Sequence, residues 1–240
     1  MMINEHYKVI AVIPAYNEEK SIHEVSTLTQ KYVDKILICD DGSVDDTPEV
    51  ISKLHFNYFS HSKNLGKGNA LRSLFKEAIN FKPDIIVTID ADGQHDPSEI
   101  PKLIEPILLD EADMVVGSRF LLTSKTDISS VRGIGLRFIN YMQKVFLKTN
   151  IMDSQSGFRA FSKTAFKVIL ESKENGYGIE SEQLIIASKN GIRIREVPVY
   201  IKYNDLYNTS KQYFIFHGTY LVLIILKLFL INLFTMQKKV

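Results

Sequence analysis

The sequence has 240 residues, with 29 Lys and Arg against 28 Asp and Glu, and a formal net charge of +1. This balance lacks the basic excess by which proteins hold nucleic acid, so we exclude nucleic acid as a partner. The length suits one large α/β domain with an appendage, and the single cysteine, Cys39, rules out an internal disulfide.

Strand-like and helix-like segments alternate through the first half of the chain. The expected strands are short, mainly apolar runs at 9–13 (ended by Pro14), 36–39, 57–60, 85–89 and 113–117. One expected helix begins near Ser21 and another at Thr47-Pro48, and two further helices cover 66–79 and 97–107. This order predicts right-handed crossovers and a mostly parallel, doubly wound sheet.

The second half is less regular. We expect a polar loop over 121–130, a helix over 132–147, a polar loop over 153–159, helices over 163–170 and 180–189, and a strand over 192–201. Pro198 within that last strand favours a position at the sheet edge or a bulge.

An almost continuous apolar run covers residues 213–234. It exceeds the about 20 residues that a membrane-spanning helix needs. We therefore predict a catalytic domain over 1–211 and a membrane-anchor segment over 212–240. Lys227 favours the alternative of a helix in the membrane interface or against a partner, because a lysine in mid-membrane costs a few kcal/mol.

The stretch 85–97, IIVTIDADGQHDP, carries the strongest chemical signal. Asp90, Asp92 and Gln94 follow a buried strand, and ligands bind outside the carboxyl ends of such strands. Carboxylate and amide oxygens suit a hard divalent cation that takes its other ligands from water and substrate phosphate. The alternative is an acidic turn that caps the next helix.

Other residues are weaker candidates taken singly. Asp40 and Asp41 suit the hydroxyl groups of a nucleotide, Lys67 between two glycines suits a phosphate, and Glu180 and Glu182 suit proton abstraction. The plain alternative is an Asp-stabilised turn for Asp40 and Asp41, an ordinary helix start for Lys67, and a solvated helix face for Glu180 and Glu182. The arginines Arg119, Arg132 and Arg159 suit phosphate, although a lone arginine is more often a surface ion-pair partner. His95 is expected to be a loop residue beside the acidic stretch.

Together these segments resemble the family 2 glycosyltransferases, and most of all the polyprenyl-phosphate sugar synthases of the dolichol-phosphate mannose synthase type. The matching motifs are VIPAYNEE at 12–19, DDGSVDDT at 40–47, GKGNAL at 66–71, DADGQHDP at 90–97, GSRF at 117–120, DSQSGFRAF at 153–161 and, more loosely, EVPVYIKY at 196–203. They span about four-fifths of the chain in the family's order.

The resemblance implies a nucleotide-diphospho-sugar transferase (GT-A) fold and a role for each matching residue. The nucleotide sugar would be held by Pro14, Tyr16, Glu18, Asp40, Asp41, Lys67 and Asp90. Asp90, Asp92 and Gln94 would hold Mg²⁺ or Mn²⁺, with Asp92, Arg119 and Arg132 as the catalytic residues. The acceptor phosphate would lie against Arg119, Arg132, Asp153, Arg159 and Lys211.

Two positions depart from the family pattern. The arginine that often precedes a late Gly/Ser-Lys pair is missing, because residues 208–211 read NTSK and keep only Ser210-Lys211. Gly93 stands where many mannose synthases have a bulkier apolar residue, so the resemblance does not specify which sugar is transferred.

The implied reaction transfers a hexose, with inversion, from a GDP- or UDP-sugar to a polyprenyl or dolichyl phosphate. A phosphate acceptor is already anionic near neutral pH, so it needs no general base. A hydroxyl acceptor on a glycan or glycolipid would need one, and Glu180 or Glu182 would serve. A catalytically silent nucleotide-sugar-binding protein is the third hypothesis. The resemblance places the catalytic domain on the cytoplasmic side of the cell membrane, and the sequence leaves a homo-oligomer open.

Overall fold

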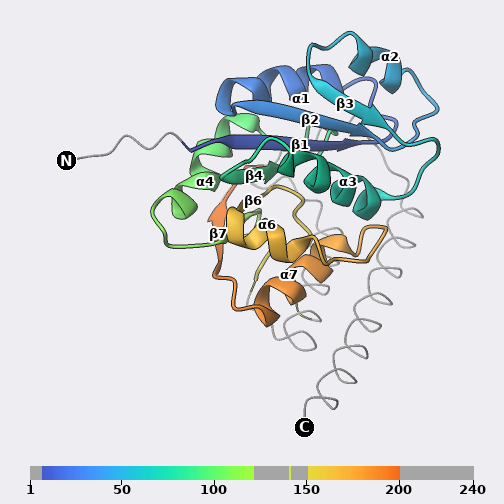
Figure 1. Cartoon of the computed structure of the whole chain (residues 1–240). Helices are drawn as coiled ribbons and strands as arrows, with labels where there is room; N and C mark the ends of the chain where they lie inside the picture. The colour runs from blue at the N-terminus through green and yellow to red at the C-terminus, as the bar shows by residue number, and fades with distance from the viewer. Residues whose placement is uncertain (1–6, 122–140, 142–150, 201–240) are drawn as a thin grey trace.

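One seven-stranded sheet organises the described residues, which are 7–121, 141 and 151–200 of this computed structural model (Figure 1). The strands are β1 (Val9–Ala15), β2 (Lys35–Asp40), β3 (Asn57–Ser60), β4 (Ile85–Thr88), β5 (Met114–Ser118), β6 (Arg159–Ser162) and β7 (Ile194–Pro198). The helices are α1 (Ile22–Thr29), α2 (Thr47–Ser52), α3 (Lys67–Ile79), α4 (Ile100–Leu108), α6 (Lys163–Ile169) and α7 (Ile179–Lys189), with 3₁₀ turns at Gln30–Tyr32 and Pro97–Glu99.

The sheet has the order β3-β2-β1-β4-β6-β5-β7 and is parallel except at β6. β6 runs antiparallel to both β4 and β5, so the expected polar loop over 153–159 gives way to a strand at Arg159. Phe158, Ala160 and Phe161 are fully buried, and Phe158 and Phe161 pack on opposite faces of the sheet. This alternation of buried residues explains why the segment joins the sheet.

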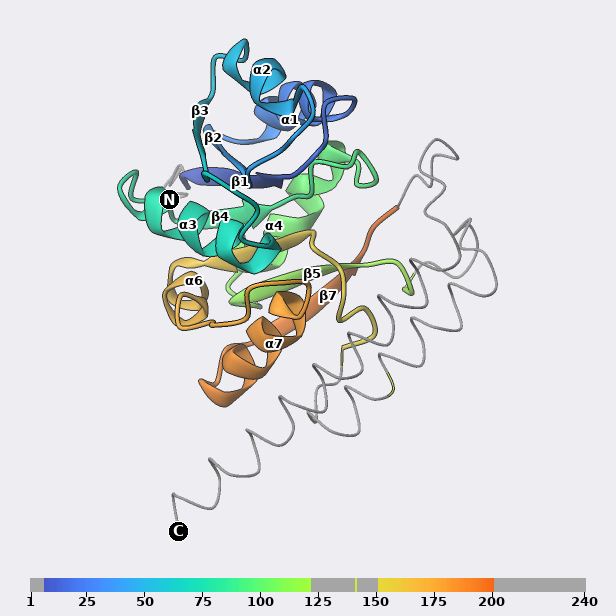
Figure 2. The ribbon, with the colours of Figure 1, turned by 90° about the vertical axis from the view of Figure 1, so that its right-hand side faces the viewer.

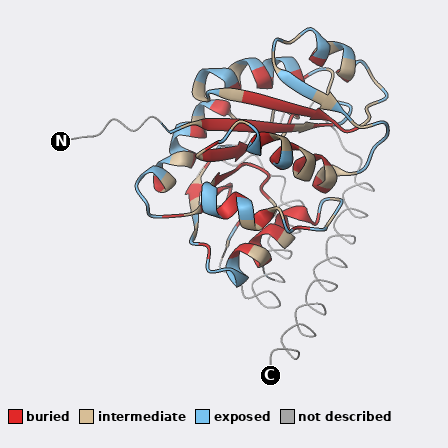
Figure 3. Ribbon diagram, in the orientation of Figure 1, coloured by how far each residue is buried: buried red, intermediate tan, exposed pale blue. Residues whose placement is uncertain are grey.

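Helices cover both faces of the sheet, as Figure 2 shows. Residues of α1, α2 and α4 pack on one face and residues of α3, α6 and α7 on the other. The central strands are therefore buried on both sides, which accounts for their nearly unbroken apolar sequences (Figure 3).

β1 continues through Pro14, where we had expected it to end. The carbonyl of Val12 accepts a hydrogen bond from Ile89 on the β4 side, and residues two apart in a strand face the same way. The nitrogen of Pro14 therefore points to the side where β4 has already ended, so no ladder hydrogen bond is lost.

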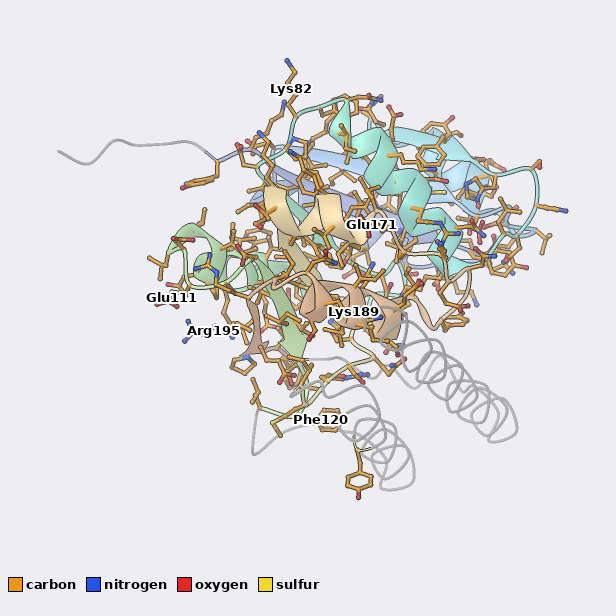
Figure 4. All side chains as sticks on the ribbon, turned by 60° about the horizontal axis from the view of Figure 1, so that its bottom comes forward. Lys82, Glu111, Phe120, Glu171, Lys189 and Arg195 are labelled. Atoms are coloured by element: carbon orange, nitrogen blue, oxygen red, sulfur yellow. The ribbon has the colours of Figure 1, made fainter. Side chains whose placement is uncertain are left out.

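β7 is shorter than the expected strand over 192–201, and it lies at the sheet edge, as Pro198 indicated. There Arg195 forms an exposed ion pair with Glu111, and Figure 4 shows the two side chains together. The expected loop over 121–130 (Leu121 apart), the helix over 132–147 (Tyr141 apart) and the apolar run over 213–234 lie outside the described residues. Within the described ranges, no helix has the length and apolar character to cross a membrane.

Candidate active site

A cleft of about 200 Å³ opens where the chain leaves β1, β2 and β4. These strands are parallel neighbours, so the loops that follow them meet at one edge of the sheet. The lining residues are Pro14, Ala15, Tyr16, Glu18, Asp41, Asn64, Gly66, Lys67, Ala70, Asp90, Ala91, Asp92, Gly176 and Tyr177. The structure thus brings together every residue predicted to hold the nucleotide sugar except Asp40.

The first two loops of the cleft are cross-linked by hydrogen bonds. The backbone N–H of Glu18 donates to the Thr47 hydroxyl at 2.7 Å, and that of Asn17 donates to the Ser43 hydroxyl at 2.9 Å. The Asn17 side chain in turn accepts from the N–H of Val44 at 2.9 Å. Thr47, at the expected start of its helix, therefore fixes the loop after β1 to the loop after β2.

The two neighbouring aspartates at the end of β2 make different contacts. Asp40 stabilises its own turn, because its carboxylate accepts the N–H of Ser43 at 3.0 Å. Asp41 faces the cleft, and its two oxygens accept the N–H groups of Leu65 at 3.0 Å and Gly66 at 2.8 Å. The turn alternative therefore describes Asp40, and Asp41 remains placed for a ligand.

Lys67 joins two carboxylates at the floor of the cleft. Its Nζ lies 2.7 Å from Asp90 and 2.8 Å from Glu180. Burial acts to lower the pKa of Lys67, but the two carboxylates outweigh it and raise the pKa above its usual range. Burial likewise acts to raise the pKa of Asp90, and the Lys67 charge lowers it overall. Both groups are therefore ionised at neutral pH.

Asp92 and Glu18 add further acidic groups to the same cleft. Burial, and to a smaller extent the nearby charges of Asp92 and Asp90, raise the pKa of Glu18 to about 7. The effect of these two aspartates on Glu18 indicates a region of negative potential, which a cation would relieve.

This set of donors fits a divalent cation that needs few protein ligands. No cluster of three or more metal-binding side chains occurs among the described residues. Mg²⁺ and Mn²⁺ sites of the substrate-bridging type use one or two carboxylates and complete their coordination with water and phosphate oxygens. Asp90 and Asp92 supply those carboxylates on the cleft wall.

Gln94 and His95 do not line the cleft. The backbone N–H of Gln94 donates to Asp92 at 2.9 Å and so orients that carboxylate. His95 is buried with its ring 5.0 Å from that of Phe158, and burial lowers its pKa to about 4, which keeps the ring neutral. The predicted role of the Gln94 amide as a metal ligand stays a prediction.

Two predicted acceptor residues, Arg119 and Asp153, bind each other. Nε and Nη2 of Arg119 donate to the two oxygens of Asp153 at 2.6 and 2.5 Å. Asp153 is fully buried, and its own N–H donates to Glu196 at 2.8 Å. In this structure Asp153 holds the Arg119 guanidinium in place at the end of β5, and its predicted role at the acceptor stays a prediction.

Arg159 also has a different role from the predicted one. Its guanidinium is buried and donates to the carbonyl oxygens of Ser154, Ser156 and Glu180 at 2.8 to 2.9 Å, and to the Gln183 side chain at 3.0 Å. Through these hydrogen bonds Arg159 ties the loop before β6 to α7, and its predicted contact with an acceptor phosphate stays a prediction.

The two candidate bases are separated in the structure. Glu182 accepts the backbone N–H groups of Lys173 and Glu174 at 2.8 and 2.7 Å, so it stabilises a loop and does not line the cleft. Glu180 is buried beside Lys67. Arg132 and Lys211, also predicted at the site, lie outside the described residues.

Sequence reasoning missed the far wall of the cleft, which Gly176 and Tyr177 form. The loop that carries them is fixed to the start of α3, where the N–H of Gly68 donates to the Asn175 carbonyl at 2.7 Å. A side chain at Gly68 would lie 2.1 Å from the Glu174 carbonyl, so the second glycine of the Gly-Lys-Gly turn is needed for this contact. Gly68 was therefore the feature of the sequence that could have indicated this wall of the cleft.

Comparison with known proteins gives a consistent result. The model of glycosyl transferase family 2 matches residues 10–170. An uncharacterized protein of Methanocaldococcus jannaschii is 39% identical over 217 residues, which cover 87% of this chain and 88% of that protein. A UDP-N-acetylglucosamine–dolichyl-phosphate N-acetylglucosaminyltransferase of Methanococcus voltae is 39% identical over 225 residues, which cover 82% of this chain and 86% of that one.

Among solved structures, a glucosyl-3-phosphoglycerate synthase of Mycobacterium tuberculosis in complex with Mn²⁺, UDP-glucose and phosphoglyceric acid superposes with a TM-score of 0.68. The match covers 92% of this chain and 79% of that one at 20% identity. This likeness confirms the predicted GT-A fold.

Proposed function

Because the chain belongs to glycosyl transferase family 2, we propose that it transfers a hexose from a nucleotide-diphosphate sugar to the phosphate of a polyprenyl or dolichyl lipid. The observation that carries the proposal is the 39% identity to a transferase named for dolichyl phosphate, which extends over 82% of this chain. The cleft supports the same reaction, since it gathers the predicted donor residues at one sheet edge.

The donor would lie along the cleft. Asp41 would accept hydrogen bonds from the nucleoside, and Asp90 and Asp92 would hold Mg²⁺ or Mn²⁺ against the diphosphate. The bound ion would act as a Lewis acid toward the leaving diphosphate. Lys67, kept cationic by its two carboxylate partners, would lie beside the same phosphates. UDP- and GDP-sugars are both donors to be tested.

The acceptor would approach from the end of β5, where Asp153 fixes the Arg119 guanidinium. Arg119, Arg132 and Lys211 would offset the repulsion between two anionic substrates and orient the attack. The acceptor phosphate oxygen would displace the nucleotide diphosphate at the anomeric carbon with inversion, and no protein group needs to remove a proton.

The apolar run over 213–234 would anchor the enzyme to the cell membrane, with the catalytic domain on the cytoplasmic side. A homo-oligomer is compatible with the arrangement.

The test uses membranes that contain the protein, a polyprenyl phosphate, Mn²⁺ or Mg²⁺, and a panel of radiolabelled nucleotide sugars. We expect metal-dependent label in the organic phase from one donor, and none with Asp92→Asn. Metal-dependent hydrolysis of a donor without any lipid label would reject the lipid-phosphate acceptor.

Glu180 is the residue that separates this proposal from the hydroxyl-acceptor alternative, because of the two predicted bases it is the one that contacts a cleft residue, Lys67. A general base contributes about 10²- to 10⁴-fold to a rate. For a phosphate acceptor we expect Glu180→Gln to lower turnover by about tenfold at most, through its contact with Lys67. A loss of about 10³-fold or more would favour the hydroxyl acceptor.

A further inference from the structure

His61 lies directly behind Asp41, on the side away from the cleft. Its Nδ1 is 2.7 Å from the Oδ1 of Asp41, and its Nε2 is 3.1 Å from the Ser73 hydroxyl on α3. The residue follows β3, and its backbone N–H donates to the Asp40 carbonyl at 2.9 Å. Backbone and side chain together fix the ring between the second loop of the cleft and α3.

The contacts determine how the ring is protonated. An ionised carboxylate only accepts hydrogen bonds, so Nδ1 of His61 must carry the proton that Asp41 accepts. In the neutral ring Nε2 is then the acceptor, and the Ser73 hydroxyl donates to it. The Asp41 carboxylate thus determines the tautomer, and the Ser73 hydroxyl is compatible with it and helps to hold the ring.

The order Ser73, His61, Asp41 is that of a nucleophilic triad, but its position excludes that role. Ser73 lies within α3, and neither it nor His61 lines the cleft, so no substrate carbon reaches the serine hydroxyl there. The row of hydrogen bonds from Ser73 through His61 ends at the Asp41 carboxylate, which faces the cleft. Its effect is therefore on how that carboxylate is held.

Three N–H groups thus surround the Asp41 carboxylate: His61 and the backbone of Leu65 and Gly66. A carboxylate has about four lone-pair positions, so these bonds leave about one for a ligand. From this geometry we propose that His61 is a positioning residue, which fixes the Asp41 carboxylate so that its remaining acceptor position meets the donor nucleotide.

This inference rests on the proposed function, in which Asp41 contacts the nucleoside. A group that positions a nucleoside contact affects the bound donor equally in the ground state and in the transition state. Its loss should therefore raise the KM for the donor and leave kcat nearly unchanged. A hydrogen bond to a charged group corresponds to about a tenfold or larger change in affinity.

The experiment measures the affinity of the full chain in detergent for UDP and for GDP in the presence of Mn²⁺, followed by the donor KM and kcat. We expect His61→Ala to weaken nucleotide binding about 10-fold and raise KM similarly. His61→Asn should recover most of the affinity, because its amide N–H can occupy the position of Nδ1. Ser73→Ala, which removes one of the contacts that hold the His61 ring, should weaken binding by about 2- to 5-fold.

Two results would overturn the inference. One is a wild-type protein that binds a nucleotide while His61→Ala binds it equally well. The other is a His61→Asn variant, folded by its thermal transition, that binds as weakly as His61→Ala. Failure of the wild type to bind either nucleotide would instead reject the proposed function, and this inference with it.

Discussion

At the scale of single residues, the geometry of the acidic site depends on a glycine that carries no chemistry. A Cβ at Gly157 would lie 2.4 Å from Oδ2 of Asp90 and 2.8 Å from Nζ of Lys67. Both atoms are the ends of flexible side chains, so they can move without disturbing the fold. The absence of a side chain at this position therefore keeps the Asp90–Lys67 pair in place.

We expect Gly157→Ala to reduce metal-dependent donor binding by about tenfold, while the thermal transition moves little, because a displaced charged pair loses about 1–3 kcal/mol of directed contacts. The matched control is Gly191→Ala. Gly191 has a φ of +69° and nothing within 4 Å of an added Cβ, so alanine there should cost about 1 kcal/mol of stability without changing donor affinity. Titration of the donor and thermal unfolding of both variants test this prediction. Equal donor affinity in Gly157→Ala and wild type would contradict it.

At the scale of elements, the sequence indicated the strands that run parallel and missed the one that does not. Alternating strands and helices up to β5 follow the rule for right-handed crossovers, and that part of the fold was predictable. β6 follows a polar loop, and its few buried residues are too short a pattern to distinguish a strand from a loop. Its antiparallel direction comes from pairing with β4 and β5, which are distant in sequence.

The contacts of Glu182 also depend on the arrangement of elements, because they are determined by where α7 begins relative to the preceding loop. Glu182 accepts two backbone N–H groups, and the amide oxygen of glutamine can accept the same bonds. We expect Glu182→Gln to keep lipid-linked transfer within about threefold of the wild type, whereas Glu182→Ala should lower the unfolding free energy by about 1 kcal/mol. A loss of 10²-fold in Glu182→Gln would return this residue to a role as base.

The candidate site was predictable where one motif follows one strand, and less so where distant segments meet. Asp41, Lys67, Asp90 and Asp92 each follow a strand or open a helix, so parallel topology was enough to bring them together. Periodicity could not show that Arg119 and Asp153 would pair, that Arg159 would be buried, or that Tyr177 would close the cleft. Those contacts join residues far apart in the chain, and only the folded geometry determines them.

At the scale of the whole molecule, the division between a catalytic domain over 1–211 and an anchor over 212–240 remains a prediction. The described residues contain both apolar layers of the sheet and the residues that line the cleft, so we expect the fold to form without the apolar run. We expect a chain ending at Lys211 to stay in the supernatant after high-speed centrifugation and to bind nucleotide with Mn²⁺. Sedimentation of this shortened chain with membranes would contradict the anchor assignment.

The most direct measurement of the site is a calorimetric titration of UDP and GDP into the full chain, with and without Mn²⁺, for the wild type and for Asp92→Asn. If Asp90 and Asp92 hold a cation that bridges to the diphosphate, one nucleotide should bind with Mn²⁺ at least about tenfold more tightly than without it, and Asp92→Asn should abolish that difference. Nucleotide binding of equal affinity with and without metal, unchanged in Asp92→Asn, would contradict a metal-dependent donor site in this cleft.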